Sequence, residues 1–77
     1  MFATVLNIVS FGRFTVFVYR LQGDYPARYK VELRAGLLYV CIRYVNSYLQ
    51  ATLLRDDMKD NVRRYIPNDC KFLIDDL

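Results

Sequence analysis

The chain has 77 residues, which is enough for one small domain and too few for a second hydrophobic core. Hydrophobic residues make up 55% of the sequence, which excludes intrinsic disorder, and the net charge of +3 is below that typical of dedicated nucleic-acid binders. Two cysteines and no histidine are too few ligands for a structural zinc site within one chain. We therefore expect a single compact domain over residues 1–77, with no metal and no cofactor.

Two apolar, β-branched segments near the N-terminus predict a β-hairpin. Both residues 2–9 and residues 13–21 can present alternate side chains to opposite faces, and Gly12 between them suits a tight turn. The side of the second strand expected to face the core comprises Phe14, Val16 and Val18. Its opposite side comprises Arg13, Thr15, Phe17 and Tyr19.

The segment at residues 28–34 has the clearest pattern in the chain, because charged and apolar residues alternate in it without a break. It follows a loop at residues 22–27 that contains glycine, aspartate and proline. Such alternation is typical of a strand with one buried and one exposed side. The predicted buried side comprises Tyr29, Val31 and Leu33. The predicted exposed side comprises Arg28, Lys30, Glu32 and Arg34.

Residues 37–45 allow two interpretations. They are rich in β-forming Tyr, Val and Ile, which favours a fourth strand after a turn at Gly36. Either Tyr39 and Arg43 or Val40 and Tyr44 would then share the exposed side of the sheet. Alternatively, a helix begins at residue 37, with one apolar face formed by Leu38, Ile42, Val45, Leu49 and Leu53. We favour the strand, because a serine suited to helix capping follows it; the helix would leave only three strands.

An amphipathic helix is predicted over residues 48–66. Ser47 and Gln50 fit a capping box, and Pro67 ends the pattern. The expected buried stripe comprises Ala51, Leu54, Met58, Val62, Tyr65 and Ile66. Residues 70–74 would add an edge strand or a tail packed on the helix. The predicted fold class is α+β: a small antiparallel β-meander of three or four strands, with one amphipathic helix of the C-terminal half packed on one face.

No pattern in the sequence indicates catalysis. There is no histidine to act as a base, and the three glycines are scattered rather than grouped in a phosphate-binding loop. A Cys41–Cys70 disulfide is conceivable, but two free thiols in a reducing cytoplasm are favoured. Arg13 interrupts the apolar N-terminal segment too early for a membrane span. We expect a non-enzymatic, cytoplasmic protein without membrane association.

The candidate site is the exposed side of the predicted sheet, where aromatic and basic residues alternate. Tyrosine and arginine are enriched at protein–protein hot spots, so a protein partner is the first interpretation. Aromatic rings among basic side chains also bind single-stranded nucleic acid, which is the alternative. A solvated or helix-covered face without a partner is the third possibility. The predicted partner-binding residues are Arg13, Phe17, Tyr19, Arg28, Lys30, Arg34, Tyr39 and Arg43.

In its short length, high tyrosine content and lack of catalytic groups, the chain resembles the small inhibitors encoded by phages and mobile elements, anti-CRISPR proteins among them. No specific motif carries this resemblance. It implies a protein-binding module that inhibits a host protein or complex. The first strand, residues 2–9, has no charge to protect it as a sheet edge, which favours a homodimer or a bound partner. A self-assembling structural subunit is the remaining alternative.

Overall fold

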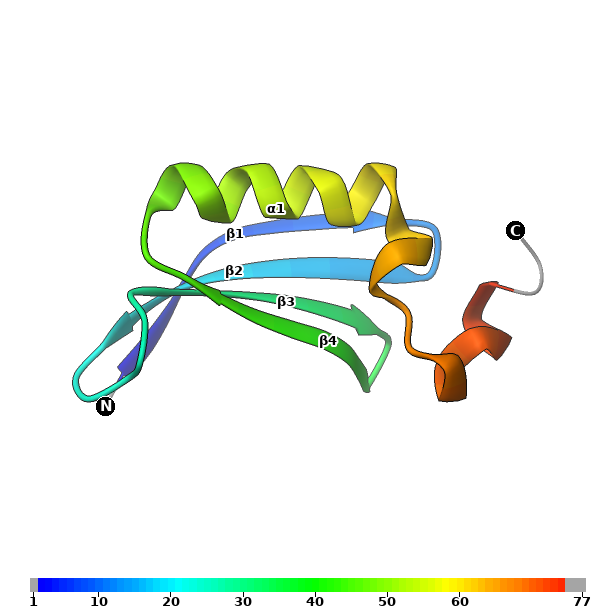
Figure 1. Ribbon diagram of the computed structural model, residues 1–77, viewed down its shortest axis with the longest axis horizontal. Coiled ribbons are helices and arrows are strands. Elements are labelled where there is room, and N and C mark those ends of the chain that lie inside the picture. Colours follow the sequence, from blue (N-terminus) through cyan, green and yellow to red (C-terminus); the bar gives the residue numbers. More distant parts are fainter. Residues whose placement is uncertain (1, 75–77) are drawn as a thin grey trace.

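The computed structural model describes residues 2–74 and has the predicted α+β architecture (Figure 1). Four antiparallel strands form one sheet in the order β1-β2-β3-β4, so each strand pairs with its neighbour in sequence. The sheet is therefore the predicted meander, in its four-stranded form. The strands are β1 (Phe2–Phe11), β2 (Phe14–Gln22), β3 (Tyr29–Ala35) and β4 (Leu38–Val45). The helical elements are the α-helix α1 (Tyr48–Asp60) and the 3-10 helices η1 (Val62–Tyr65) and η2 (Asn68–Ile74).

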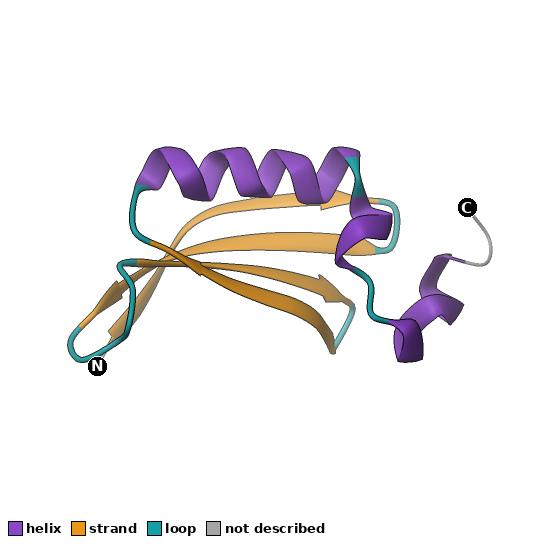
Figure 2. Cartoon of the chain, viewed as in Figure 1, coloured by secondary structure: helices purple, strands orange, loops and turns teal. Residues whose placement is uncertain are grey.

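The α1 helix lies along one side of the sheet (Figure 2) and packs against β2, β3 and β4. The core lies between these two layers. Its strand residues alternate as predicted, because Phe14, Val16 and Val18 are buried opposite Val31 and Leu33. The helix contributes the buried Ala51 and Met58, and the following segments add Ile66 and Leu73. Leu49 and Leu53, which lie outside the predicted buried stripe of the helix, are exposed.

The start of α1 lies at the predicted residue, although the Gln50 side chain accepts from the Asn46 N–H at 3.3 Å rather than closing the capping box on Ser47; the end of the helix differs from the prediction. The Ser47 hydroxyl accepts a hydrogen bond from the Gln50 N–H at 3.1 Å, which caps the first turn. The helix was expected to continue to residue 66, but it ends at Asp60. Asn61 departs from helical geometry, with φ of −132°, and its side chain donates to Asp57 at 2.7 Å. Short polar side chains that bond locally in this way compete with the helix, and the short 3-10 helix η1 follows directly.

The C-terminal segment forms neither an added strand nor a tail along α1. Residues Asn68–Ile74 make up the 3-10 helix η2, which lies beyond the end of the sheet that carries both tight turns (Figure 1). Those turns contain Gly12 and Gly36, with φ of 55° and 62°. Such left-handed conformations favour glycine. η2 joins the core through Leu73, which is 5% exposed.

Two strands each contain one extra residue. In β1, Val5 pairs with Tyr19 and Asn7 with Val18, so Leu6 is unpaired. In β4, Cys41 pairs with Leu33 and Tyr39 with Arg34, so Val40 is unpaired. Each irregularity is a β-bulge, which reverses the alternation of side chains beyond it. The bulges therefore decide which residues of β1 and β4 share a face of the sheet.

Both cysteines are free thiols: Cys41 is buried and Cys70 is half-buried. Burial raises the pKa of the Cys41 thiol above its ordinary value, although Arg43 opposes the shift. Within residues 2–74, none of the helices has the length and apolar character needed to cross a membrane.

Candidate functional site

The candidate site is the side of the sheet opposite α1, which we call the open face. On β3 it carries the residues that alternate with the buried Val31 and Leu33. Residues paired across antiparallel strands lie on the same face, so the register extends the open face to the other three strands. The open face comprises Ala3, Val5, Ile8, Ser10, Thr15, Phe17, Tyr19, Leu21, Lys30, Glu32, Arg34, Tyr39, Ile42 and Tyr44.

The bulge at Val40 sets the composition of this face on β4. Without it, Tyr39 would share a face with Arg43. With it, Tyr39 lies beside Arg34, whereas Ile42 and Tyr44 lie beside Glu32 and Lys30. Arg43 instead pairs with Val31 on the side of the sheet that carries α1. The bulge therefore gives the open face two tyrosines and an isoleucine from a single edge strand.

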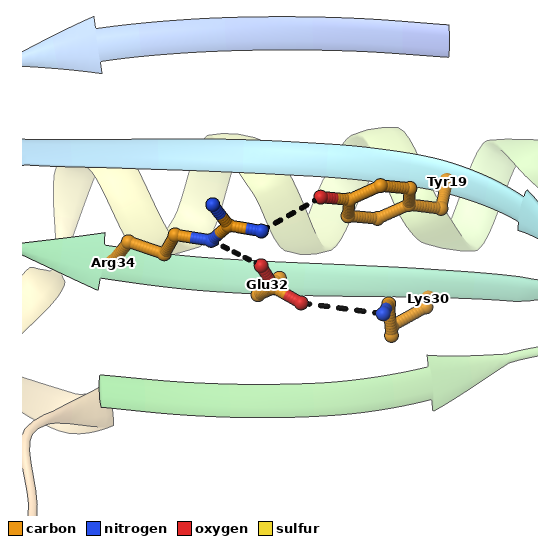
Figure 3. Close-up of polar contacts among 4 residues, drawn as sticks. All are labelled: Tyr19, Lys30, Glu32 and Arg34. Atoms are coloured by element: carbon orange, nitrogen blue, oxygen red, sulfur yellow. Dashed lines mark hydrogen bonds and ion pairs between the residues drawn. The ribbon is translucent and has the colours of Figure 1, made fainter. Parts of the chain in front are cut away.

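A buried glutamate organises the centre of the open face. Glu32 is only 2% exposed, although it lies on the side away from α1 (Figure 3). Its carboxylate binds Lys30, with Nζ to Oε2 at 3.3 Å, and accepts a hydrogen bond from the Arg34 Nε–H. Arg34 also donates from Nη2 to the Tyr19 hydroxyl at 2.9 Å. These contacts satisfy the buried carboxylate, as a charge held out of water requires.

The two cations of this network also lie over aromatic rings. The Arg34 guanidinium carbon is 4.2 Å from the Phe17 ring centroid and 4.6 Å from that of Tyr39. Lys30 Nζ lies 4.4 Å from the centroid of the Tyr19 ring. These distances are within the range of cation–π attraction. The arrangement holds the side chains of three adjacent strands in place before any partner binds.

The electrostatics of the cluster follow from Glu32. Burial alone would lower the pKa of Arg34, but the hydrogen bond and the charge of Glu32 outweigh it and raise the pKa. Arg34 is therefore a fixed cation. Because Lys30, Glu32 and Arg34 carry two positive charges and one negative charge, the centre of the face has a net charge of only +1.

Apolar and aromatic side chains surround this centre and remain accessible. Tyr39 is 58% exposed, Ile8 55%, Tyr44 50% and Ile42 39%. Large side chains exposed together on one surface are typical of an interaction site. The face offers ring and aliphatic surface for contact, and a central arginine that still has donor capacity.

The structure places five of the eight predicted site residues on the open face: Phe17, Tyr19, Lys30, Arg34 and Tyr39. The other three lie apart from it. Arg13 is in the β1–β2 turn, and Arg28 is in the loop before β3, where its carbonyl oxygen accepts from the Leu21 N–H at 2.8 Å. Arg43 is on the other side of the sheet, 6.0 Å from the Tyr65 ring centroid.

The sequence reasoning missed three apolar members of the face, namely Val5, Ile8 and Ile42, and gave Tyr44 only as an alternative to Tyr39. Val5 and Ile8 share a face because the bulge at Leu6 separates them. Composition carried no signal for either bulge. The one indication in the sequence that these residues could belong to an interaction surface was the presence of β-branched residues in the two predicted edge strands.

Besides the open face, a pocket lies at the outer edge of β4. This pocket of about 340 Å³ is lined by Val40, Cys41, Ile42, Arg43 and residues 64–67. Its polar groups already have partners within the chain. Tyr65 donates to the Asp57 carboxylate, and Arg64 lies 3.6 Å from it. We therefore regard the pocket as secondary to the open face.

Searches for relatives of this chain found no matching family model, no matching curated protein and no matching solved structure.

Proposed function

We propose that this protein is a small, non-enzymatic protein-binding module whose partner docks on the open face of the sheet. The observation that carries the proposal is the pre-ordered Arg34, held between the rings of Phe17 and Tyr39 and bonded to Glu32. Arginine and tyrosine fixed within an apolar surround have the composition of binding hot spots. Because the network already holds these side chains, little conformational entropy remains to be lost on binding.

The same contacts argue against the alternative of single-stranded nucleic acid. A nucleic-acid platform needs free ring faces for bases and free cations for phosphates. On the open face, Lys30 and Arg34 are both engaged by Glu32 and both lie over rings. The favoured partner surface is therefore apolar, to match the exposed rings and aliphatic side chains that surround the network.

We further propose that binding inhibits the partner, a host protein or complex, in the cytoplasm. A module that acts only by occupying a surface needs no catalytic group. The support for inhibition is the resemblance in size and composition to the inhibitors of phages and mobile elements. The two free thiols agree with a reducing compartment.

Affinity capture with two matched double variants tests the site. Replacing Tyr39 and Tyr44 by alanine removes exposed rings from the open face, and these side chains are 58% and 50% exposed. Replacing Leu49 and Leu53 by alanine removes comparably exposed side chains from α1, 67% and 59% exposed, on the other side of the molecule. We expect the tyrosine variant to lose affinity for the captured protein at least about tenfold, and the leucine variant to keep it.

Two results would contradict the proposal. One is equal capture by the wild type and the tyrosine variant. The other is capture of single-stranded nucleic acid with an affinity that falls steeply with salt concentration, as phosphate contacts require. An inhibition assay on the identified partner then tests the functional part of the proposal separately.

A further inference from the structure

β1 is an unprotected sheet edge. Its ten residues, Phe2–Phe11, include none with a charge, and within residues 2–74 only β2 pairs with it. Phe2 is 72% exposed, Ile8 55%, Val5 46% and Leu6 41%. Natural sheets usually protect an edge with charged residues, proline or a short strand, since free backbone groups there can pair with another chain. β1 has none of these features, although its bulge at Leu6 interrupts the edge.

We propose that two copies of this protein pair through β1, antiparallel, about a two-fold axis between Leu6 and Asn7. The pairing joins the two four-stranded sheets into one sheet of eight strands. The inference does not rest on the proposed function, because it is argued from the backbone edge of β1, although the edge residues Ala3, Val5, Ile8 and Ser10 also belong to the open face.

The direction of the backbone groups shows which residues can pair. The Leu21 N–H donates to the Arg28 carbonyl oxygen, so Leu21 directs its backbone groups away from β1. Hydrogen-bonded and non-hydrogen-bonded pairs alternate along antiparallel strands. The β1 residues opposite Leu21, Tyr19, Phe17 and Thr15 therefore direct their N–H and C=O groups to the free edge. These four residues are Ala3, Val5, Ile8 and Ser10.

One register uses all four residues. In a two-fold antiparallel pair, Ala3 lies opposite Ser10 of the second copy when Val5 lies opposite Ile8. Every other symmetric register places fewer of these four residues opposite one another, because the bulge at Leu6 makes the spacing between them uneven. The chosen register forms four hydrogen-bonded pairs across the axis, with two reciprocal bonds in each.

The side chains of β1 match in the same register. It places Phe2 opposite Phe11, Thr4 opposite Val9 and Val5 opposite Ile8, so that residues of similar shape meet. Paired residues must also share a face of the sheet. They do so here because the bulge reverses the alternation between the two halves of β1, as the β2 register shows. An isologous contact requires this self-complementarity.

Charge and the position of α1 favour a second copy at β1 rather than at β4. β1 carries no charge, so two identical strands meet without repulsion. The β4 strand contains the charged Arg43, and a symmetric pair centred near it would bring two arginines together. The α1 helix has its main contacts with β2, β3 and β4 rather than with β1.

Matched proline variants test the interface. Ile8→Pro removes an N–H that faces the free edge, so the β1–β2 ladder keeps its bonds while the proposed dimer loses one hydrogen bond from each copy. The control is Ile42→Pro at the opposite edge, where the Ile42 carbonyl accepts from Arg43 Nη1 at 3.3 Å and so also points outward. Ile8→Lys is a second variant with a side-chain effect, and circular dichroism reports whether each variant is folded.

Sedimentation equilibrium over a wide concentration range should give a wild-type mass that rises to twice that of a single chain. The folded Ile8 variants should raise the dimer dissociation constant roughly tenfold or more, and Ile42→Pro should leave it unchanged. A wild-type protein that stays monomeric at every concentration overturns the proposal. So does a dimer that the folded Ile8 variants do not weaken.

Cysteine cross-linking tests the register in a background with Cys41→Ala and Cys70→Ser. The proposed pairing places Thr4 opposite Val9 in a non-hydrogen-bonded pair, with Cα atoms about 4.5 Å apart. The two Thr4 positions are about 17 Å apart, beyond the reach of a disulfide. A mixture of Thr4→Cys and Val9→Cys chains should form the mixed disulfide, and Thr4→Cys alone should not link to itself. The reverse pattern rules out this register.

Discussion

The two faces of β3 are buried in different ways. On one face, Val31 and Leu33 are fully buried beneath α1. On the other, Glu32 is 2% exposed without a helix above it, because the side chains of Lys30, Arg34 and their neighbours cover it. Burial by a packed helix removes apolar surface from water permanently. Burial by a layer of side chains depends on the charges and rings that form the layer, so a substitution within the open face can uncover Glu32 while the core remains intact.

The largest expected effect tests the helix-covered face. Leu33→Ala should lower the free energy of unfolding by about 2–5 kcal/mol, because it leaves a cavity beneath α1. Urea denaturation measures the change. The matched control, Leu53→Ala, removes the same atoms from a side chain that is 59% exposed, and it should cost less than about 0.5 kcal/mol. Equal losses for the two variants would mean that α1 does not form the core described here.

Glu32→Gln tests the open face and should have a smaller effect. The variant leaves the half-exposed Lys30 and Arg34 without their counter-charge, and we expect a loss of about 1–3 kcal/mol. The control is Asp56→Asn, which breaks the exposed pair with Arg55 and should cost about 0–1 kcal/mol. NMR shifts should change on Phe17 and Tyr39 but little on Val31. Shifts spread evenly over both faces would remove the distinction between them.

The helix can be weakened without a change to either face. Ser47→Ala removes the hydroxyl that accepts from the Gln50 N–H, and should cost about 1 kcal/mol. Hydrogen exchange should quicken in the first turn of α1, while amides of the open-face strands keep their relative protection. A variant as stable as the wild type would show that packing alone fixes the start of the helix.

The smallest effect concerns the end of α1 and depends on pH. The hydrogen bond from Tyr65, with help from Asn61 and Arg64, holds the pKa of Asp57 below its ordinary value. A lowered folded-state pKa contributes stability that is complete above the unfolded-state value, about 3.9, and is lost as the pH falls through the folded-state value. Tyr65→Phe should therefore reduce the loss of stability in acid, measured by thermal melts from neutral to low pH. An unchanged acid profile would contradict this assignment.

The parts of the fold that follow simple periodicity could be predicted from the sequence. Alternation at residues 28–34 identified both faces of β3, and β-forming residues with a capping serine distinguished β4 from a helix. The end of α1 could not be predicted in this way, because the apolar stripe continues through Val62 and Ile66 while the backbone leaves the helix at Asn61. A stripe shows which side chains face the core, and it does not show that the backbone between them is helical.

The open face was predictable only where the strands are regular. Phe17, Tyr19, Lys30 and Arg34 follow unbroken alternation in β2 and β3, and they lie together as expected. Arg43 was assigned to this face and lies on the other, because the bulge at Val40 reverses the alternation. A bulge inserts one residue without a composition of its own, so sequence patterns of period two cannot locate it. The burial of Glu32 could not be predicted from the sequence either, because it depends on side chains from neighbouring strands.

The meander order of the sheet has a consequence for how the chain folds. Every strand pairs with the strand next to it in sequence, so no pairing has to wait for a distant segment. Sheets with such local contacts fold faster than sheets with long crossovers, because each hairpin closes only a short loop. During synthesis, β1 emerges first and can pair as soon as β2 follows the turn at Gly12. The apolar strand β1 therefore lacks a neighbour on both of its sides only for the time needed to add β2.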